Sequence, residues 1–315
     1  MNKFFRLFKK VNGIKVLKQY FRAHILLFAV VETILIGFSK KSMEIVRCAA
    51  DNKILNKLRK KYKKKIQAFV SEIEKENYEQ KKSNIVWVCW FQGMEKAPDL
   101  VKKCFDSLKA NLTNKEIIVI TEENYKDYIT FPEFIEEKIV DGIITKTHLS
   151  DLLRLELLIN YGGTWIDATV FCSGANYPEY LFDSDLFMYQ DLKPGFDGHS
   201  ARISSWFMTA CTNNKILLLT RALLYSYWKN KKYMIDYFLL HDFIELSIEA
   251  YEDIWEKVVP VSNSTPHILL LRLFEQYDER VWNATKESTC FHKLSYKFEE
   301  DLYGKKGTYF DLIIR

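Results

Sequence analysis

The stretch that decides the fold is SDLLRLELLINYGGTWIDATVFCS, residues 150–173. Its first half predicts a buried helix that carries one acid, Asp151, and one base, Arg154, among apolar residues. Because residues three positions apart lie on one face of a helix, these two side chains should face the same space. The helix ends at Gly162 and Gly163, and a β-rich run with one acid, Asp167, follows. The stretch therefore predicts a helix, a tight turn and a strand that ends in a carboxylate.

Strands and helices alternate on both sides of this stretch. Apolar, β-rich runs predict strands at 85–91, 116–120, 164–171, 186–189 and 206–210. Helical patterns lie at 51–82, 99–110, 125–139, 147–161, 215–229, 235–255 and 266–276, with Thr147 and Ser150 as candidate caps of the helix at 147–161. The alternation, followed by a helical tail, predicts an α/β fold with a mostly parallel central sheet. In such sheets, ligands bind at the carboxyl ends of the strands.

Charge is distributed unevenly along the chain. Residues 1–65 contain 18 Lys and Arg against three acids, a net charge of +15, whereas the remaining residues have a net charge of −10. We place a domain boundary near Ser83, between a basic helical N-terminal extension (1–82) and the main domain (83–315). A basic end favours phosphate-bearing partners, either lipid headgroups or nucleic acid. The acidic body would repel a nucleic-acid backbone, so we expect an anionic membrane surface as partner and no nucleic acid.

The N-terminal extension contains an apolar segment, residues 25–38, which is interrupted by Glu32. It is shorter than the ~20 residues that a spanning helix needs, so we expect a helix that lies at the membrane surface. A helix packed on the body of the protein and a full membrane span are the alternatives. The basic block RKKYKKK at 59–65 is either a solvated helix face or a further contact with anionic lipid.

The cysteines and the N-terminus bear on the compartment. The six cysteines are scattered without metal-ligand spacing, and no convincing signal-peptide cleavage site follows the apolar segment. This usage is typical of a reducing compartment. We therefore expect a cytoplasmic protein, peripherally associated with the inner face of the cell membrane.

Residues 150–173 also contain the side chains best suited to chemistry. Asp151 and Arg154 either form an internal salt bridge or bind the hydroxyls of a sugar. Gly162 suits a helix cap, and Gly163 permits close approach of backbone or ligand. A strand-end carboxylate such as Asp167 can bind a divalent cation that neutralises a diphosphate, whereas Thr169, two residues later, is a poorer ligand.

The segments WVCWFQG, EIIVIT, SDLLR, YGG and WIDAT together resemble the bacterial capsular polysaccharide synthesis proteins. These belong with the sugar transferases that carry a DXD-type motif, related to the yeast initiating mannosyltransferases and the large clostridial glucosylating toxins. The resemblance runs from residue 84 to the C-terminus. It implies a GT-A (Rossmann-like) nucleotide-sugar transferase fold. It also implies transfer of a sugar from a nucleotide-diphospho-sugar to a growing capsular or cell-surface polysaccharide, on a glycan or lipid-linked saccharide acceptor, with retention of configuration.

The resemblance assigns roles to individual residues. Asp151 and Arg154 would hold donor-sugar hydroxyls, and Asp167 would be the first acid of the DXD element, near the ribose and a Mn²⁺ or Mg²⁺ ion. Thr169 replaces the second acid, a departure that weakens direct metal coordination. Further cofactor contacts are expected from the following residues: Trp90, Phe91 and Gln92 for the base and ribose (or, alternatively, as core aromatics), and Gly162 and Gly163 in the turn.

The C-terminal part supplies candidates for closing the site. In CFHKLSYK, His292 suits a metal ligand, and Lys293 and Lys297 suit phosphate contacts. Weaker candidates, each with a structural alternative, are His267, His241, Asp242, Ser204, Ser205 and Trp206. The leaving diphosphate would be neutralised by the divalent ion or by such Lys and His side chains.

Other functions compete with this interpretation. A non-catalytic membrane-surface scaffold of the polysaccharide assembly machinery would explain the basic end and the incomplete DXD element. A nucleic-acid-binding protein would explain RKKYKKK but not the acidic body. A transferase that uses a different phosphate-activated donor is the third alternative.

Overall fold

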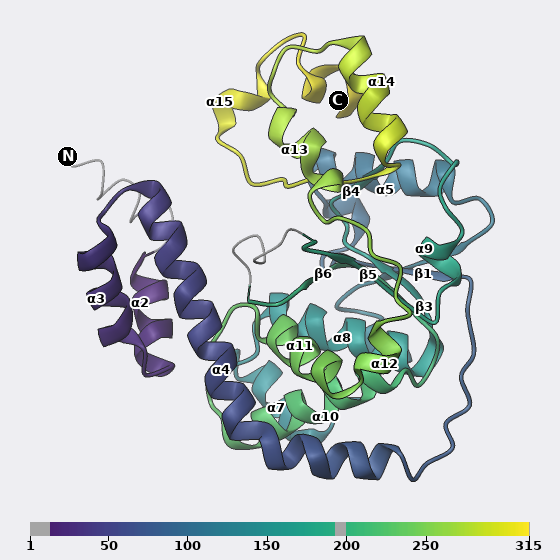
Figure 1. Cartoon of the computed structure of the whole chain (residues 1–315). Coiled ribbons are helices and arrows are strands. Elements are labelled where there is room, and N and C mark those ends of the chain that lie inside the picture. Colours follow the sequence, from purple (N-terminus) through teal and green to yellow (C-terminus); the bar gives the residue numbers. More distant parts are fainter. Residues whose placement is uncertain (1–12, 193–199, 315) are drawn as a thin grey trace.

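A five-stranded sheet lies at the centre of the computed structural model, which describes residues 13–192 and 200–314 (Figure 1). Its strand order is β2-β1-β3-β6-β5, with bounds Ile85–Cys89 (β1), Glu116–Ile120 (β2), Gly163–Ile166 (β3), Leu186–Gln190 (β5) and Ile203–Ala210 (β6). β1 pairs in parallel with β2 and β3, and β6 pairs antiparallel with β3 and β5. Four of these five strands therefore share one direction, which confirms the α/β class and the mostly parallel sheet.

Helices cover both faces of the sheet (Figure 1). One face packs against α7 (Glu133–Val140), α8 (Lys146–Tyr161), α10 (Lys215–Asn230) and α11 (Leu239–Ala250), with α6 (Tyr125–Tyr128) and α12 (Glu252–Trp255) at its margins. The other packs against α5 (Asp99–Asn111) and α9 (Tyr180–Asp183), with η1 (Met94–Lys96) before α5. Trp87 belongs to the first hydrophobic cluster, and Val86 and Val88 belong to the second. This division follows from the alternation of side chains along a strand.

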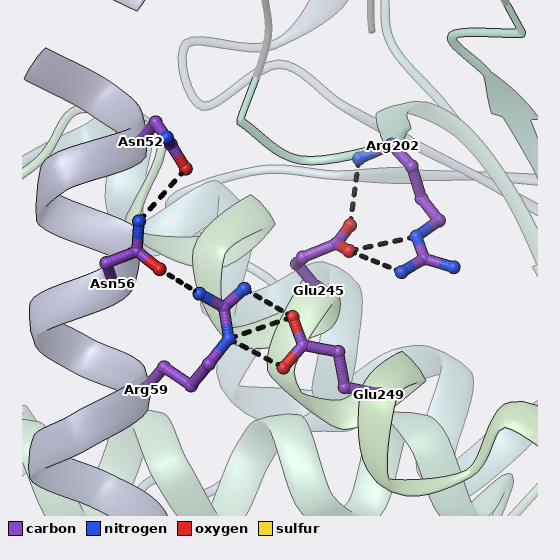
Figure 2. A network of polar contacts seen from close by, with 6 residues as sticks. All are labelled: Asn52, Asn56, Arg59, Arg202, Glu245 and Glu249. Atoms are coloured by element: carbon purple, nitrogen blue, oxygen red, sulfur yellow. Dashed lines mark hydrogen bonds and ion pairs between the residues drawn. The ribbon is translucent and has the colours of Figure 1, made fainter. Parts of the chain in front are cut away.

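A long helix, α4 (Lys40–Ile73), ties the N-terminal segment to the body. Its buried side chains recur mostly every three or four positions and belong to the same hydrophobic cluster as α10 and α11, which α4 contacts: Val46, Ala50, Ile54, Leu55, Leu58 and Tyr62. Figure 2 shows Arg59 extended from α4 to Glu249 on α11, and Nε of Arg59 lies 2.8 Å from Oε2 of Glu249. Glu245, one turn earlier, accepts from the backbone N–H of Arg202 at 2.8 Å.

The basic block at 59–65 is thus partly engaged with the body. Besides Arg59, Lys65 donates to Ser226 on α10, and the intervening Tyr62 is buried. The division of the chain at residues 82 and 83 stays a prediction, since α4 shares its hydrophobic cluster with the main domain.

The helices α2 (Gly13–Arg22) and α3 (Leu26–Ile36) pack on the first half of α4, away from the sheet (Figure 1). Tyr20, Ile25 and Ala29 are buried at this contact. The outer face is apolar as well, because Leu27 is 78% exposed and Leu35 is 75% exposed. Across residues 13–192 and 200–314, no helix combines the length and the apolar character needed to cross a bilayer. The segment therefore packs on the protein through one face and leaves a second apolar face uncovered.

A second, two-stranded sheet connects the main sheet to the C-terminal region. β4 (Val170–Cys172) pairs antiparallel with β7 (Phe291–Lys293), so that Val170 lies opposite Lys293. Around this sheet, α13 (Ile268–Arg272), α14 (Glu279–Ser288), α15 (Glu300–Tyr303) and the short turns η2 (Thr265–His267) and η3 (Phe310–Ile314) surround a separate hydrophobic cluster. This pairing brings the C-terminal region next to the end of β3.

Several predicted boundaries were wrong for local reasons. The predicted strand 164–171 is two strands separated by a turn, in which the Val170 N–H donates to the Asp167 carbonyl at 3.0 Å. The hydroxyl of Thr145, and not that of Thr147 or Ser150, caps α8 by accepting from the His148 N–H. The predicted helices at 125–139 and 235–255 are each divided in two, and the predicted helix at 51–82 begins at residue 40 and ends at residue 73.

The turn between α8 and β3 requires both glycines. Gly162 and Gly163 have φ angles of +66° and +91°, a backbone conformation that residues with a Cβ rarely adopt. A Cβ on Gly163 would lie 2.3 Å from the carbonyl oxygen of Ile85, because β1 runs directly beside it. The close approach allowed by Gly163 is therefore to the backbone of the neighbouring strand.

Gly163→Ala should lower the free energy of unfolding by about 3 kcal/mol or more, through backbone strain together with steric overlap. Gly142→Ala is the matched control, because Gly142 also has a positive φ (+67°) but nothing lies within 4 Å of its added Cβ. That change should cost only about 1 kcal/mol. Urea unfolding measures both values, and equal losses would contradict the assigned overlap.

Candidate active site

The centre of the site is the contact between Arg154 on α8 and Asp167 at the end of β3. From the turn at Gly162, Arg154 is about 12 Å back along a helix that rises ~1.5 Å per residue. Asp167 is about 16 Å forward along a strand that rises ~3.3 Å per residue. α8 leads into the turn and β3 leads out of it, so the two elements lie antiparallel. Their side chains at these distances therefore come close together. Nη2 of Arg154 lies 3.2 Å from Oδ1 of Asp167.

Arg154 is held on every side. It is 5% exposed, and its guanidinium carbon lies 4.8 Å from the centre of the Trp165 ring. Nη1 donates to the Ser205 hydroxyl on β6 and lies 3.6 Å from Oδ1 of Asp151. Among the residues that the structure describes, Nε of Arg154 has no hydrogen-bond partner. A buried donor of this kind is costly to leave unpaired.

A chain of hydrogen bonds fixes Asp151 from behind. Nε1 of Trp228 lies 3.0 Å from Nε2 of His148, and Nδ1 of His148 lies 3.2 Å from Oδ2 of Asp151. An indole N–H can only donate, so Nε2 of His148 accepts and Nδ1 carries the hydrogen that Asp151 accepts. Asp151 is thereby oriented toward Arg154 while its side chain stays 14% exposed.

Lys293 brings a second cation to Asp167. Its Nζ lies 3.1 Å from Oδ2 of Asp167 and donates to Oγ1 of Thr169 at 2.6 Å. Burial alone would raise the pKa of Asp167, but the positive charges of Lys293 and Arg154 outweigh this effect and lower the pKa below its ordinary value. Asp167 therefore stays ionised at neutral pH.

The predicted nucleotide contacts lie at the end of the neighbouring strand β1. Trp90 follows β1, and its ring packs edge-on against Tyr296 at 5.4 Å. Within the described part of the chain, the buried Nε1 of Trp90 lacks a hydrogen-bond partner. Phe91 is partly buried and Gln92 is exposed, while Lys297 lies 5.6 Å from the Tyr296 ring.

Other predicted residues lie elsewhere. Gly162 and Gly163 are at the opposite end of β3 from Asp167, where they contact backbone, so a direct cofactor contact does not fit their position. His292 is fully buried between Trp282 and Phe171 and bonds the Ser173 hydroxyl at 2.9 Å. Burial lowers the pKa of His292 to about 3. Because neighbours along a strand face opposite ways, Lys293 faces Asp167 and His292 faces away from it.

The weaker candidates divide in the same way. Ser205 touches Arg154, and the carbonyl of Trp206 accepts from the Asp167 N–H at 2.9 Å. The ring of Trp206 instead stacks on Tyr189 and contacts His267, beside the site. Asp242 is buried, and burial together with the charges of Asp236 and Asp51 raises its pKa, so it belongs to the packing of α11. Ser204 lies opposite Tyr189 in the sheet, and His241 packs on Phe238.

The residues present do not fit a divalent metal ion. Mg²⁺ is usually held by one or two carboxylates together with substrate phosphates and water, and Mn²⁺ takes the same kinds of oxygen ligand. Here each oxygen of Asp167 already faces a cation, and Thr169 accepts from Lys293. No group of three His, Cys, Asp or Glu side chains in residues 13–192 and 200–314 is arranged to hold a metal.

Sequence reasoning missed two residues near the centre. His148 lies three positions before Asp151, so its helical spacing was a usable signal. Tyr237 lies in the loop before α11 and is 57% exposed. The pKa of the Tyr237 phenol is raised, mainly by its partial burial and secondarily by the negative charges of Asp151 and Asp167. Nothing in the local sequence around Tyr237 signals this proximity.

Comparison with known proteins identifies the family. The sequence matches the capsular polysaccharide synthesis protein family over residues 36–313. The chain belongs to this family. The resemblance seen in residues 84–315 is therefore confirmed, and the match extends N-terminally to include α4.

Individual proteins of known type are also similar to this chain. O-glycosyltransferase braB of Annulohypoxylon truncatum is 30% identical over 102 residues, which cover 27% of this chain and 23% of that protein. The chain thus matches about a quarter of that relative's length. The solved structure of PaToxG Glycosyltransferase is similar with a TM-score of 0.39 and 14% identity, over 82% of this chain and 94% of that one.

A double-mutant cycle tests the chain behind Asp151. His148→Ala should cost about 3 kcal/mol of unfolding free energy, since it leaves a cavity and an unpaired indole N–H. Trp228→Phe should cost about 2 kcal/mol or more, through the lost hydrogen bond and the cavity that the smaller ring leaves in the core. In the double variant the indole N–H is absent, so the combined loss should fall about 1 kcal/mol short of the sum. Strict additivity in urea unfolding would contradict the assigned bond.

Proposed function

We propose that the chain is a glycosyltransferase. It moves a sugar from a nucleotide-diphospho-sugar to a glycan or lipid-linked saccharide acceptor of a capsular or cell-surface polysaccharide. The observation that carries the proposal is the convergence of Asp151, Arg154, Asp167 and Lys293 at the carboxyl end of β3. Ligands of α/β sheets bind at this edge. Membership of the capsular polysaccharide synthesis protein family and the similarity to glycosyltransferases support the same assignment.

Each side chain suits one part of such a donor. Carboxylates accept hydrogen bonds from sugar hydroxyls, and Asp151 and Asp167 are the two acids here. The guanidinium of Arg154 donates to hydroxyl or phosphate oxygens, and the ammonium of Lys293 neutralises diphosphate charge. Trp90 and Tyr296 offer aromatic surface for the base. The GT-A description and the retention of configuration remain part of the proposal, and the anomeric form of the product would decide the latter.

A thermal-shift screen of nucleotide-sugars, with transfer measured for those that bind, tests the proposal. Ligands that bind only the folded form raise its melting temperature. Asp151→Asn, Arg154→Ala and Asp167→Asn should each lower the transfer rate by at least about 100-fold, because each removes a group aimed at the donor. Asp106→Asn, on the exposed face of α5, is the matched control. Wild-type rates in all three site variants would reject the site. A protein that binds no nucleotide-sugar would instead fit the scaffold alternative.

The proposal includes a peripheral location on the inner, anionic face of the membrane. The outer face of α2 and α3 exposes large apolar side chains: Ile14, Phe21, Leu27, Ile34 and Leu35. The same segment carries exposed cations at Lys18, Arg22, Lys40 and Lys41. An apolar helix face in a segment rich in cations suits the boundary between headgroups and acyl chains of an anionic bilayer.

Leu27→Asp with Leu35→Asp should reduce sedimentation with phosphatidylglycerol vesicles by at least about tenfold, since both substitutions place a charge on exposed apolar area that the bilayer would cover. Both side chains point away from α4, so the fold should persist. Val140→Asp is the matched control, because Val140 on α7 is 83% exposed and lies on another surface. Undiminished sedimentation of the double variant would show that this face does not hold the membrane.

A further inference from the structure

Lys293 occupies the position between the two residues that correspond to a DXD element. In the D-A-T sequence of residues 167–169, Thr169 stands where a DXD element has its second acid. Nζ of Lys293 lies 3.1 Å from Oδ2 of Asp167 and 2.6 Å from Oγ1 of Thr169. We infer that this ammonium supplies the positive charge that a divalent cation supplies at a pair of carboxylates, so that donor binding requires no metal. The inference rests on the proposed function and specifies how the diphosphate is recognised.

The charges around Asp167 support this inference. Arg154 faces Oδ1 and Lys293 faces Oδ2, so two cations already balance the two acids Asp151 and Asp167. A divalent ion on either oxygen of Asp167 would stand beside a guanidinium or an ammonium and be repelled by it. Thr169 agrees with this arrangement, because a neutral hydroxyl can accept from an ammonium without adding a negative charge that would attract a metal.

The backbone holds Lys293 in this place. Lys293 lies opposite Val170 in the β4–β7 pair, and the next N–H, that of Leu294, donates to the Thr169 carbonyl at 2.9 Å. The Lys293 side chain is 20% exposed, so its position is fixed while one side remains open to a ligand. An ammonium has three N–H donors. Asp167 and Thr169 engage two of them, which leaves the third for a diphosphate oxygen.

The transfer of the sugar to the acceptor can proceed without a metal ion. The bond between the anomeric carbon and the diphosphate oxygen breaks, and its electron pair leaves on that oxygen. The acceptor hydroxyl oxygen forms the new bond to the anomeric carbon, and its proton passes to the departing diphosphate. The ammonium of Lys293 stabilises the charge that develops on the leaving group.

Calorimetric titration of a panel of nucleoside diphosphates (UDP, GDP, CDP and ADP), in EDTA and in Mn²⁺, tests the inference. The wild-type protein should bind one of them with the same affinity in both buffers. Lys293→Met should weaken this binding at least tenfold in both, whereas Lys109→Met, an exposed lysine of α5, should leave it unchanged. The double variant Lys293→Ala with Thr169→Asp restores two carboxylates without the ammonium. It should bind weakly in EDTA and regain at least tenfold in Mn²⁺.

The outcomes separate this inference from the proposed function. Wild-type binding that appears only with Mn²⁺ would overturn the role of Lys293 and leave the transferase proposal standing. Absence of binding in both buffers, for the whole panel and for the nucleotide-sugars, would overturn the transferase proposal and the inference with it. If circular dichroism shows that Lys293→Met does not fold, the affinities of the wild-type protein in EDTA and in Mn²⁺ test the inference by themselves.

Discussion

The site depends on the ion pair between the buried guanidinium of Arg154 and the carboxylate of Asp167. Moving a guanidinium out of water is expensive unless its donors are paired, and here Asp167, Ser205 and Asp151 surround it. A buried ion pair contributes little net stability, because the cost of removing both charges from water offsets their attraction. This pair does fix where the helix face and the strand end meet. The surrounding groups are arranged about that meeting point.

Two layers of structure serve this contact. On one side, Trp228 and His148 orient Asp151 through the core between α8 and α10. On the other, the small β4–β7 sheet presents Lys293 to the free oxygen of Asp167. The turn at residues 167–169 is what allows this second arrangement, because it ends β3 and starts a new strand in a different sheet. A continuous strand through residue 171 would have left no partner position for β7.

The N-terminal helices combine a structural role with an exposed apolar surface. The buried side chains of α4 pack into the same hydrophobic cluster as α10 and α11, and Arg59 adds a polar contact to Glu249. The charge run at 59–65 looked uniform in sequence, yet it contains both a buried tyrosine and cations bonded to the body. Helical periodicity, more than net charge, decides which of these residues face the protein.

The sequence by itself determined the alternating strands and helices, the mostly parallel sheet and the placing of Asp151 and Arg154 on one helix face. The contact of Arg154 with Asp167 agrees with local spacing, because the helix enters and the strand leaves the same glycine turn, but the structure was needed to show it. The tertiary structure alone decided that Lys293, 124 residues after Thr169, donates to it, and that His292 turns away. It also decided that the charges of Asp151 and Asp167 act on the Tyr237 phenol and raise its pKa. These facts depend on which distant strand pairs with β4 and in which register, and a one-residue shift of that pairing would exchange the faces of Lys293 and His292.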